Sequence, residues 1–212
     1  MHVETLAVGP LGCNCAIIAD LVAQRAIVVD PGGDFDAINA RLTGLGVRVD
    51  AIVHTHTHFD HVGCTAELQR ATGAAASIHE GDRPLYDLLA EQAVLFGVEA
   101  PVRADMDSAL TDGLAIHAGA VELSVMHTPG HTFGSCSFIV GDAAHRLVLT
   151  GDTLFRGSIG RTDLGGIDQE TILRSIESRL IPLGDDVVVI PGHGPTTTIG
   201  EERAHNRFLR RL

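Results

Sequence analysis

With 212 residues the chain is long enough to bury an apolar core, and we expect one domain spanning residues 1–212. Its formal net charge of −12 disfavours nucleic acid as a partner, because the phosphate backbone would be repelled. No apolar run approaches the roughly 20 residues that cross a bilayer, and the first ten residues do not resemble a secretory signal. We therefore expect a soluble, cytoplasmic protein that binds neither nucleic acid nor membrane; the sequence carries no indication of its oligomeric state.

The first half of the chain alternates strands with helices. We predict three strands, at residues 3–8, 14–20 and 26–30. Apolar residues recur at helical spacing over 35–46, where Gly44 or Gly46 provides a stop. A buried strand within 49–56 then runs directly into a histidine-rich segment, which is followed by a short helical pattern and by a longer one over 83–97.

The second half is rich in strands. These are predicted at residues 114–119, 121–128, 135–142 and 146–152. A helix over 168–180 and a final buried strand within 186–194 complete the pattern. The mixture indicates an α/β layered fold in which helices cover the outer faces of two sheets.

The four cysteines of the chain are few and lack paired Cys-x-x-Cys spacing. They are Cys13, Cys15, Cys64 and Cys136. This pattern favours neither a disulfide framework nor a thiolate zinc finger, so we expect buried free thiols.

A segment of eight residues carries four imidazoles and a carboxylate. It reads His54-Thr-His56-Thr-His58-Phe-Asp60-His61. In an extended loop alternate side chains point the same way, so His56, His58 and Asp60 can converge, and a turn into the following helix brings His61 alongside. Neutral imidazole and carboxylate are good ligands for first-row metals. His54 lies on the strand side, where a core or supporting role is expected.

Three later segments each end a strand in a glycine-bearing turn with one residue of ligand type. These residues are His131 in TPGHTFGS, Asp152 in LTGDTLF and His193 in IPGHGP. Glycine beside each lets the backbone approach closely. Five histidines and two carboxylates exceed what one tetrahedral zinc can use, which favours two ions that share Asp152 as a bridge. The histidines without such partners are expected to be surface or strand residues: His2, His79, His117, His127, His145 and His205.

Together these motifs resemble the signature of the metallo-β-lactamase superfamily over nearly the whole chain. The resemblance implies an αββα four-layer sandwich with the site at one edge of the sheets. It also implies that one zinc is held by His56, His58 and His131, and the other by Asp60, His61 and His193, with Asp152 between them.

The chain is more closely similar to short glyoxalase II-like hydrolases. The similarity rests on VVDPGGD, GDTLFRGSIGRTDLGG, LIPLGDDVVVIPGHGPTTTIGEER and HNRFL. Members of that group resemble hydroxyacylglutathione hydrolases without their C-terminal helical domain. The implied reaction is attack of a hydroxide that bridges two Zn²⁺ ions on a thioester such as S-lactoylglutathione, with Asp60 orienting it. Two positions depart from the pattern of that group. Ala16 stands where the group often has Tyr after Asn-Cys, and Arg207 stands where it often has Pro after His-Asn.

Several residues keep two interpretations. Asp30 either accepts a hydrogen bond from a ligand histidine or serves only the turn. Arg161 in GRTD either binds a substrate carboxylate or forms a structural salt bridge. The arginines near the C-terminus either help to bind an anion or are solvated; they are Arg203, Arg207, Arg210 and Arg211.

The chief rival function is that of a persulfide dioxygenase, a related branch that also carries GRTD. It would use one iron held by His56, His131 and Asp152, so one or two Fe ions are the alternative cofactor. A β-lactamase is less favoured, because many carry Cys where this pattern has Asp and are exported. A nuclease would show a basic surface or an RNA-binding insertion. A non-catalytic metal-binding protein is disfavoured because all seven ligand positions are filled.

Overall fold

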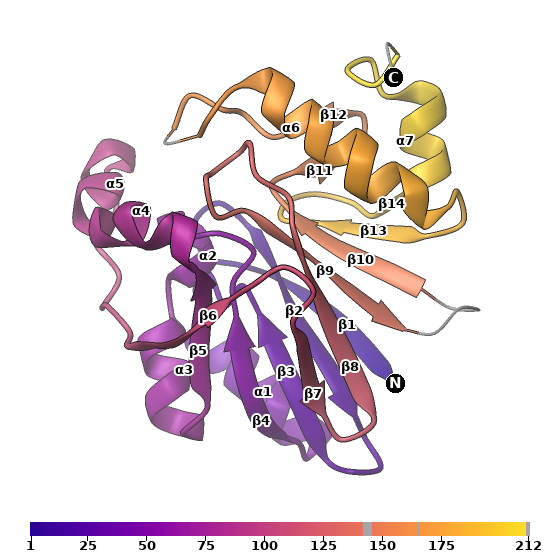
Figure 1. Ribbon diagram of the computed structural model, residues 1–212. Coiled ribbons are helices and arrows are strands. Elements are labelled where there is room, and N and C mark those ends of the chain that lie inside the picture. Colours follow the sequence, from indigo (N-terminus) through magenta and orange to yellow (C-terminus); the bar gives the residue numbers. More distant parts are fainter. Residues whose placement is uncertain (142–145, 165, 211–212) are drawn as a thin grey trace.

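The computed structural model of the protein describes residues 1–141, 146–164 and 166–210 (Figure 1). Its strands are β1 (His2–Val8), β2 (Cys13–Asp20), β3 (Arg25–Val29), β4 (Arg48–Val53), β5 (Ala75–His79), β6 (Met106–Leu110), β7 (Ala115–Ala118), β8 (Val121–His127), β9 (Cys136–Gly141), β10 (Arg146–Gly151), β11 (Leu154–Phe155), β12 (Ser158–Ile159), β13 (Val188–Pro191) and β14 (Thr197–Thr198). Its α-helices are α1 (Phe35–Leu45), α2 (Phe59–Val62), α3 (Thr65–Thr72), α4 (Arg83–Asp87), α5 (Leu89–Phe96), α6 (Gln169–Ser175) and α7 (Ile199–His205). Among these described elements, β1 to β6 form one sheet in chain order, and the second has the order β14-β13-β10-β9-β8-β7.

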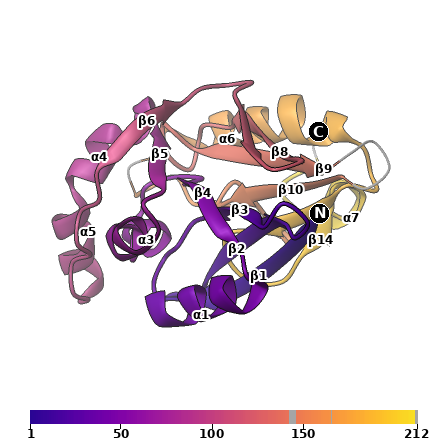
Figure 2. The ribbon, with the colours of Figure 1, turned by 90° about the horizontal axis from the view of Figure 1, so that it is seen from below.

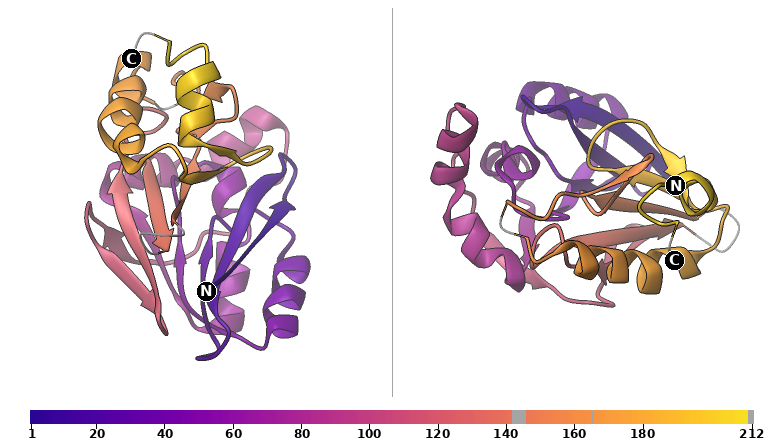
Figure 3. Two further views of the ribbon diagram at one scale, coloured as in Figure 1. Left: turned by 90° about the vertical axis from the view of Figure 1, so that its right-hand side faces the viewer. Right: turned by 90° about the horizontal axis from the view of Figure 1, so that it is seen from above.

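The two sheets stack face to face, with helices outside each of them (Figure 2). Strand alternation builds this arrangement: in β2, Ile17 packs toward α1 and α3, whereas Ile18 packs between the sheets. On the other side Ile172 of α6 and Ile199 of α7 cover the second sheet, and the layers are visible from above (Figure 3). The predicted αββα four-layer sandwich is confirmed.

The predicted helix over 83–97 is two helices, α4 and α5, that meet at Leu88. At the junction the carbonyl of Leu85 accepts a 2.8 Å hydrogen bond from the side chain of Gln92 and a 3.1 Å bond from the backbone N–H of Leu88. In a continuous helix that carbonyl would accept from the backbone four residues later. The Gln92 amide also accepts from the backbone N–H of Phe59 at 2.9 Å, so α5 is held beside α2.

The sequence did not predict the strands β5 and β6, the helix α7 or the two-residue strands β11, β12 and β14. β6, with the sequence MDSAL, is an edge strand of mixed polarity without a clear apolar pattern.

The predicted stop of α1 is Gly46, whose left-handed φ of 65° suits glycine. None of the helices in the described ranges combines the length and apolar character that crossing a bilayer requires. All four cysteines are buried and free, as predicted.

Candidate metal centre

Loops that follow four strands of the two sheets meet at one edge of the sandwich. β4 leads into the histidine-rich loop and α2, β10 leads into Asp152, and β13 leads into His193. His131 lies in the loop between β8 and β9. The structure brings all seven residues predicted as ligands together at this edge, with their side-chain donor atoms in overlapping groups.

The first group of donors consists of His56, His58 and His131. Nε2 of His131 lies 3.2 Å from Nε2 of His56 and 2.9 Å from Nδ1 of His58, and the last two nitrogens lie 3.0 Å apart. Three nitrogens around a tetrahedral zinc, with Zn–N near 2.0–2.1 Å, would lie about 3.3 Å apart. The spacing in this group therefore fits a metal ion of that size.

The second group of donors consists of Asp60, His61 and His193. Nε2 of His193 lies 3.1 Å from Oδ2 of Asp60 and 3.2 Å from Nε2 of His61. Asp152 stands between the groups, because its Oδ1 is 3.4 Å from Nε2 of His61 and its Oδ2 is 3.6 Å from Nε2 of His131. Oδ1 is buried and has no hydrogen-bond partner among the described residues. Such an atom is costly unless a cation compensates it.

Backbone carbonyls set the tautomers in the first group. Nε2 of His58 donates to the carbonyl of Leu164 at 2.9 Å, and Nδ1 of His131 donates to the carbonyl of Arg161 at 2.7 Å. When both rings are neutral, the nitrogens that face each other therefore carry lone pairs. Lone pairs 2.9 Å apart repel, and a metal ion between them removes the conflict.

In the second group the carboxylate of Asp30, rather than a backbone carbonyl, fixes the tautomer of His61. Its Oδ2 lies 3.1 Å from Nδ1 of His61 and accepts the hydroxyl hydrogen of Thr55 at 2.6 Å. The Thr55 oxygen in turn accepts from Nδ1 of His56 at 3.1 Å. The prediction that Asp30 bonds a ligand-type histidine is thus confirmed, in a side chain only 2% exposed.

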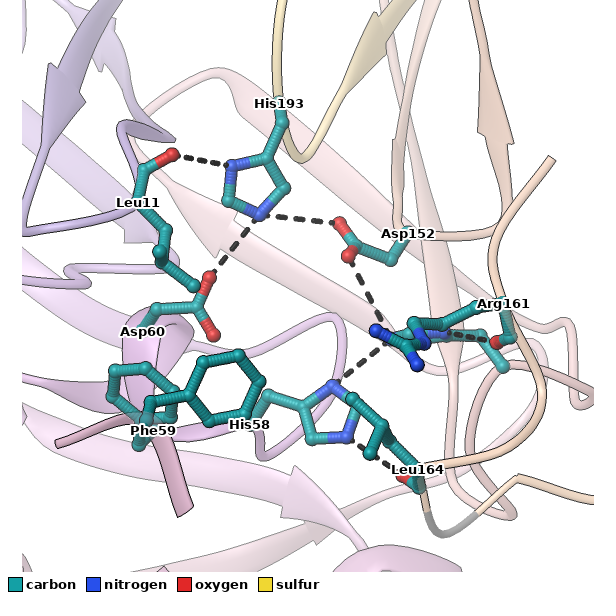
Figure 4. A pocket seen from close by; sticks show the side chains of 10 residues that line it. Leu11, His58, Phe59, Asp60, Asp152, Arg161, Leu164 and His193 are labelled. Carbon is teal, nitrogen blue, oxygen red and sulfur yellow. Dashed lines mark hydrogen bonds and ion pairs between the residues drawn. The ribbon is translucent and has the colours of Figure 1, made fainter. Parts of the chain in front are cut away.

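His193 is the most accessible imidazole in the second group, with 26% of its side chain exposed. Its Nδ1 donates to the carbonyl of Leu11 at 3.1 Å, which leaves Nε2 facing Asp60 and Asp152 (Figure 4). A Cβ on the neighbouring Gly192 would collide with Asp152. The absence of a side chain at this position therefore permits the close approach that the sequence predicted.

Burial and charge both suit metal ligation. Burial lowers the pKa of His131 to about 4 and that of His56 well below its usual value, so both rings are neutral at pH 7. Burial alone would raise the pKa of Asp152, but His61, His131 and His193 outweigh it and keep this carboxylate ionised. Burial also opposes charge on His61, yet Cys13 and the carboxylates of Asp152, Asp60 and Asp30 raise its pKa well above the ordinary value. The second group thus favours a positive charge, which a divalent cation would supply.

One important residue, Asp82, was missed in the sequence. Its buried carboxylate accepts from the backbone N–H of Thr57 at 3.0 Å, from the Thr132 hydroxyl at 2.9 Å and from the backbone N–H of Gly134 at 2.6 Å. It therefore links the histidine-rich loop to the loop that carries His131. The local sequence EGDRP looks like an ordinary turn, so no motif signals this role.

The remaining candidates lie apart from the donors. His54 is buried with its Nε2 3.3 Å from the Thr65 hydroxyl, in agreement with a supporting role. The Arg161 guanidinium makes two hydrogen bonds to Asp163, of 2.6 and 2.8 Å, and also lines the pocket at the site. Contact of Arg161 with a substrate therefore stays a prediction.

The other histidines and arginines singled out in the sequence have separate surroundings. Among the described residues, His2, His79, His117, His127 and His205 belong to none of the donor groups. Arg203 pairs with Asp185, Arg207 stacks on Phe208 and Arg210 is exposed, and none of the three lines the pocket. Ala16 is fully buried between the sheets. His145 and Arg211 lie outside the described residues.

Above the donors is a pocket of about 150 Å³ with an apolar rim. It is lined by the polar donor residues His58, Asp60, His131, Asp152 and His193 and by the apolar residues Leu11, Phe59, Phe96 and Leu164. In Figure 4 the side chains of Asp60, Asp152 and His193 point toward one another. Convergent polar groups beneath apolar walls are typical of a small-molecule site.

The fold and this donor set define a family. A family model described as the metallo-beta-lactamase superfamily matches residues 8–193, and the chain belongs to that superfamily. It is 36% identical over 216 residues to a hydroxyacylglutathione hydrolase, GloC, of Haemophilus influenzae, covering 99% of this chain and 98% of the relative. The chain is accordingly a metal-dependent hydrolase.

Two solved structures extend the comparison. The B3 metallo-beta-lactamase BLEG-1 is 34% identical with a TM-score of 0.90, covering 99% of this chain and all of that one. TTHA1623, crystallised in a di-iron-bound form, is also 34% identical with a TM-score of 0.87, covering 97% of this chain and all of that one. Both likenesses extend over essentially the full length of the fold.

Proposed function

We propose that this chain is a binuclear zinc hydrolase that cleaves thioesters such as S-lactoylglutathione. The observation that carries the proposal is Asp152, whose two carboxylate oxygens face different donor groups at 3.4 and 3.6 Å. A carboxylate in this position is suited to bridging two ions, whereas a single ion would need only one group. The similarity to a hydroxyacylglutathione hydrolase supports the thioester as substrate.

In this proposal each donor group binds one metal ion. His56, His58 and His131 would hold one ion, Asp60, His61 and His193 would hold the other, and Asp152 would serve both. Bound zinc would supply an acidified water and would polarise the thioester carbonyl. Hydrolysis forms a bond from the water oxygen to the carbonyl carbon and breaks the carbon–sulfur bond, and the products are a carboxylic acid and a thiol. The thiol needs no strong general acid, since its pKa is about 8.5.

Asp60 has a second task beside binding. Despite its burial, the neighbouring His61 and His193 keep its pKa low, so it is an anion at neutral pH. Its carboxylate lies at the floor of the pocket, where it can accept a hydrogen bond from the attacking water. We assign to Asp60 the orientation of that water.

The test combines metal analysis with turnover. The protein is purified without added metal, its metal content is measured, and hydrolysis of S-lactoylglutathione is followed beside a panel of other thioesters and lactones. We expect two zinc ions per chain and thioester turnover that chelation abolishes and zinc restores. Failure to hydrolyse any thioester with two zinc ions bound would refute the proposal. One iron per chain, with oxygen consumption on glutathione persulfide, would favour the dioxygenase instead.

A second candidate is β-lactam hydrolysis, favoured by the full-length likeness to a B3 metallo-beta-lactamase. The same donor set would serve a lactam carbonyl. A chromogenic cephalosporin in the same assay separates the two activities, and iron-loaded protein belongs in the same series because a similar structure contains two irons. We expect thioesters to have the higher kcat/KM.

A further inference from the structure

An apolar groove continues from the pocket above the metal donors. Its volume is about 330 Å³, and it shares His58, Phe96 and Leu164 with that pocket. Its other apolar walls are Leu85 and Leu88 from α4 and its end, and Leu95 from α5. A molecule whose reactive carbon lies above the donors can therefore extend into the groove without leaving the protein.

The apolar walls of the groove are exposed to solvent. Leu95 is 70% exposed, Leu88 is 49% exposed and Phe96 is 42% exposed. Exposed large apolar side chains that adjoin a polar site commonly mark a ligand surface. The wall is also fixed in place, because Gln92 ties α5 to the backbone of Phe59 and Thr57.

The charges around the groove disfavour an anion. The carboxylates of Glu91 and Asp163 line it. Among the described residues that line the groove and the pocket, the only cationic side chain besides histidine is Arg161, which already makes two hydrogen bonds to Asp163. An uncharged, apolar occupant meets no such penalty.

We propose that this groove is the binding site for the acyl chain of the substrate, and that the preferred thioesters carry an unbranched, uncharged acyl group of about six carbons or more. This inference rests on the proposed function for the reaction, but the groove itself is defined by its own residues. Burial of each methylene contributes about a fourfold gain in binding when complete. In a half-open groove, four methylenes give about a 10- to 50-fold gain.

The acyl chain suits the groove better than the thiol does. During hydrolysis the sulfur becomes a thiolate, and a developing anion is poorly stabilised against leucine side chains beside Glu91. The acyl carbons stay neutral throughout the reaction. The thiol side is therefore assigned to the open, solvent-facing side of the pocket.

The kinetic test compares acetyl and hexanoyl thioesters of N-acetylcysteamine, a small uncharged thiol, on the zinc-loaded protein. We expect kcat/KM to be about 10- to 50-fold higher for the hexanoyl thioester. Leu95→Glu places a carboxylate in the groove and should reduce this ratio at least about fivefold. The acetyl thioester of hexanethiol should gain less than the hexanoyl thioester, and a larger gain would overturn the assignment of the acyl chain.

Val94→Glu is the matched control, because it adds the same charge one residue earlier on α5. Val94 is 79% exposed and lines neither the groove nor the pocket. The ratio should stay at the wild-type value in this variant. An equal reduction in both variants would indicate a general charge effect and would refute the groove as the acyl site.

A binding measurement separates this inference from the proposed function. The hexyl thioether of N-acetylcysteamine cannot be hydrolysed, and its binding to the protein as purified is measured by calorimetry. We expect binding that Leu95→Glu weakens and Val94→Glu does not. Such binding without hydrolysis of any thioester would support the groove as an alkyl-chain site and refute the thioesterase function. Thioester hydrolysis without a preference for long acyl chains would support the thioesterase function and refute the groove as the acyl site. A dimer that Leu95→Glu dissociates would place a second copy of the chain in the groove and overturn the inference.

Discussion

The two donor groups of the candidate centre differ in charge and in access to solvent. The first group consists of three imidazoles, of which His56 is 2% and His131 is 3% exposed. The second includes the carboxylate of Asp60, and the side chain of His193 is 26% exposed. The first group is thus neutral and mostly buried, with His58 partly exposed at the pocket, and the second is anionic and more open to solvent at His193. Two similar ions would differ in how tightly they are held and in how easily substrate reaches them.

The supports behind the two groups differ as well. In the first group His58 and His131 rely on backbone carbonyls, which no substitution of side chain removes directly, and His56 reaches Asp30 only through the Thr55 hydroxyl. In the second group His193 relies on a backbone carbonyl, whereas His61 relies directly on the carboxylate of Asp30, which a single substitution removes. The second group should therefore be the more sensitive to mutation behind the ligands.

Asp152 belongs to both groups, so its loss should have the largest effect. In Asp152→Ala each group loses an oxygen donor, and we expect less than one zinc per chain and a fall in kcat/KM of about 1,000-fold or more, since bound metal contributes several kcal/mol. Metal analysis and thioester kinetics measure both. Asp186→Ala, at an exposed carboxylate, serves as the control. Two zinc ions retained in Asp152→Ala would contradict the bridging assignment.

The difference between the groups is tested by His131→Ala and His193→Ala. We expect each variant to retain one zinc, but the loss in kcat/KM should be about 100- to 1,000-fold for His131 and about 10- to 100-fold for His193. The reason is that the side chain of His193 is 26% exposed and that of His131 only 3%, so a water ligand can replace the imidazole of His193 more easily. Equal losses would show that exposure does not distinguish the groups.

Asp30→Asn tests the support of the second group. The new amide N–H₂ would face the Thr55 hydroxyl and Nδ1 of His61, where the carboxylate now accepts hydrogen bonds. His61 would have to change tautomer, which places a proton on the nitrogen that faces Asp152. We expect zinc affinity and kcat/KM to fall about 10- to 100-fold, measured by competition with a chelator. Asp36→Asn on the exposed side of α1 should change neither; unchanged affinity in Asp30→Asn would refute this role.

Asp163→Ala should have the smallest effect, and it tests Arg161. The hydrogen bonds from Arg161 lower the pKa of Asp163 to about 2, so this carboxylate is an anion at neutral pH. Removal of Asp163 frees the guanidinium, and we expect the preference for S-lactoylglutathione over the acetyl thioester of N-acetylcysteamine to rise about two- to fivefold. Arg161→Gln in the Asp163→Ala background should abolish the gain. If the preference does not rise, the guanidinium does not reach the substrate.

The type and order of the candidate ligands were predictable from the sequence. Metal chemistry restricts ligands to a few side chains, and strands that end in histidine or aspartate beside glycine place them at one edge of a sheet. The layered fold followed from apolar periodicity, which is a local property. The break between α4 and α5 did not, because the contact between the Gln92 side chain and the Leu85 carbonyl at the junction is not encoded in periodicity.

Only the tertiary structure decided which nitrogen of each imidazole faces the centre, which residues link the loops and where the groove runs. The carbonyls of Leu11, Arg161 and Leu164 orient three of the rings, yet every residue has a carbonyl, and only the folded chain determines which one lies within 3.1 Å of an imidazole nitrogen. Asp82 likewise acts through backbone groups of distant loops. The sequence specifies which side chains are present and hence their chemistry. The hydrogen-bond partners of backbone groups, in contrast, depend on how distant segments pack in the folded chain.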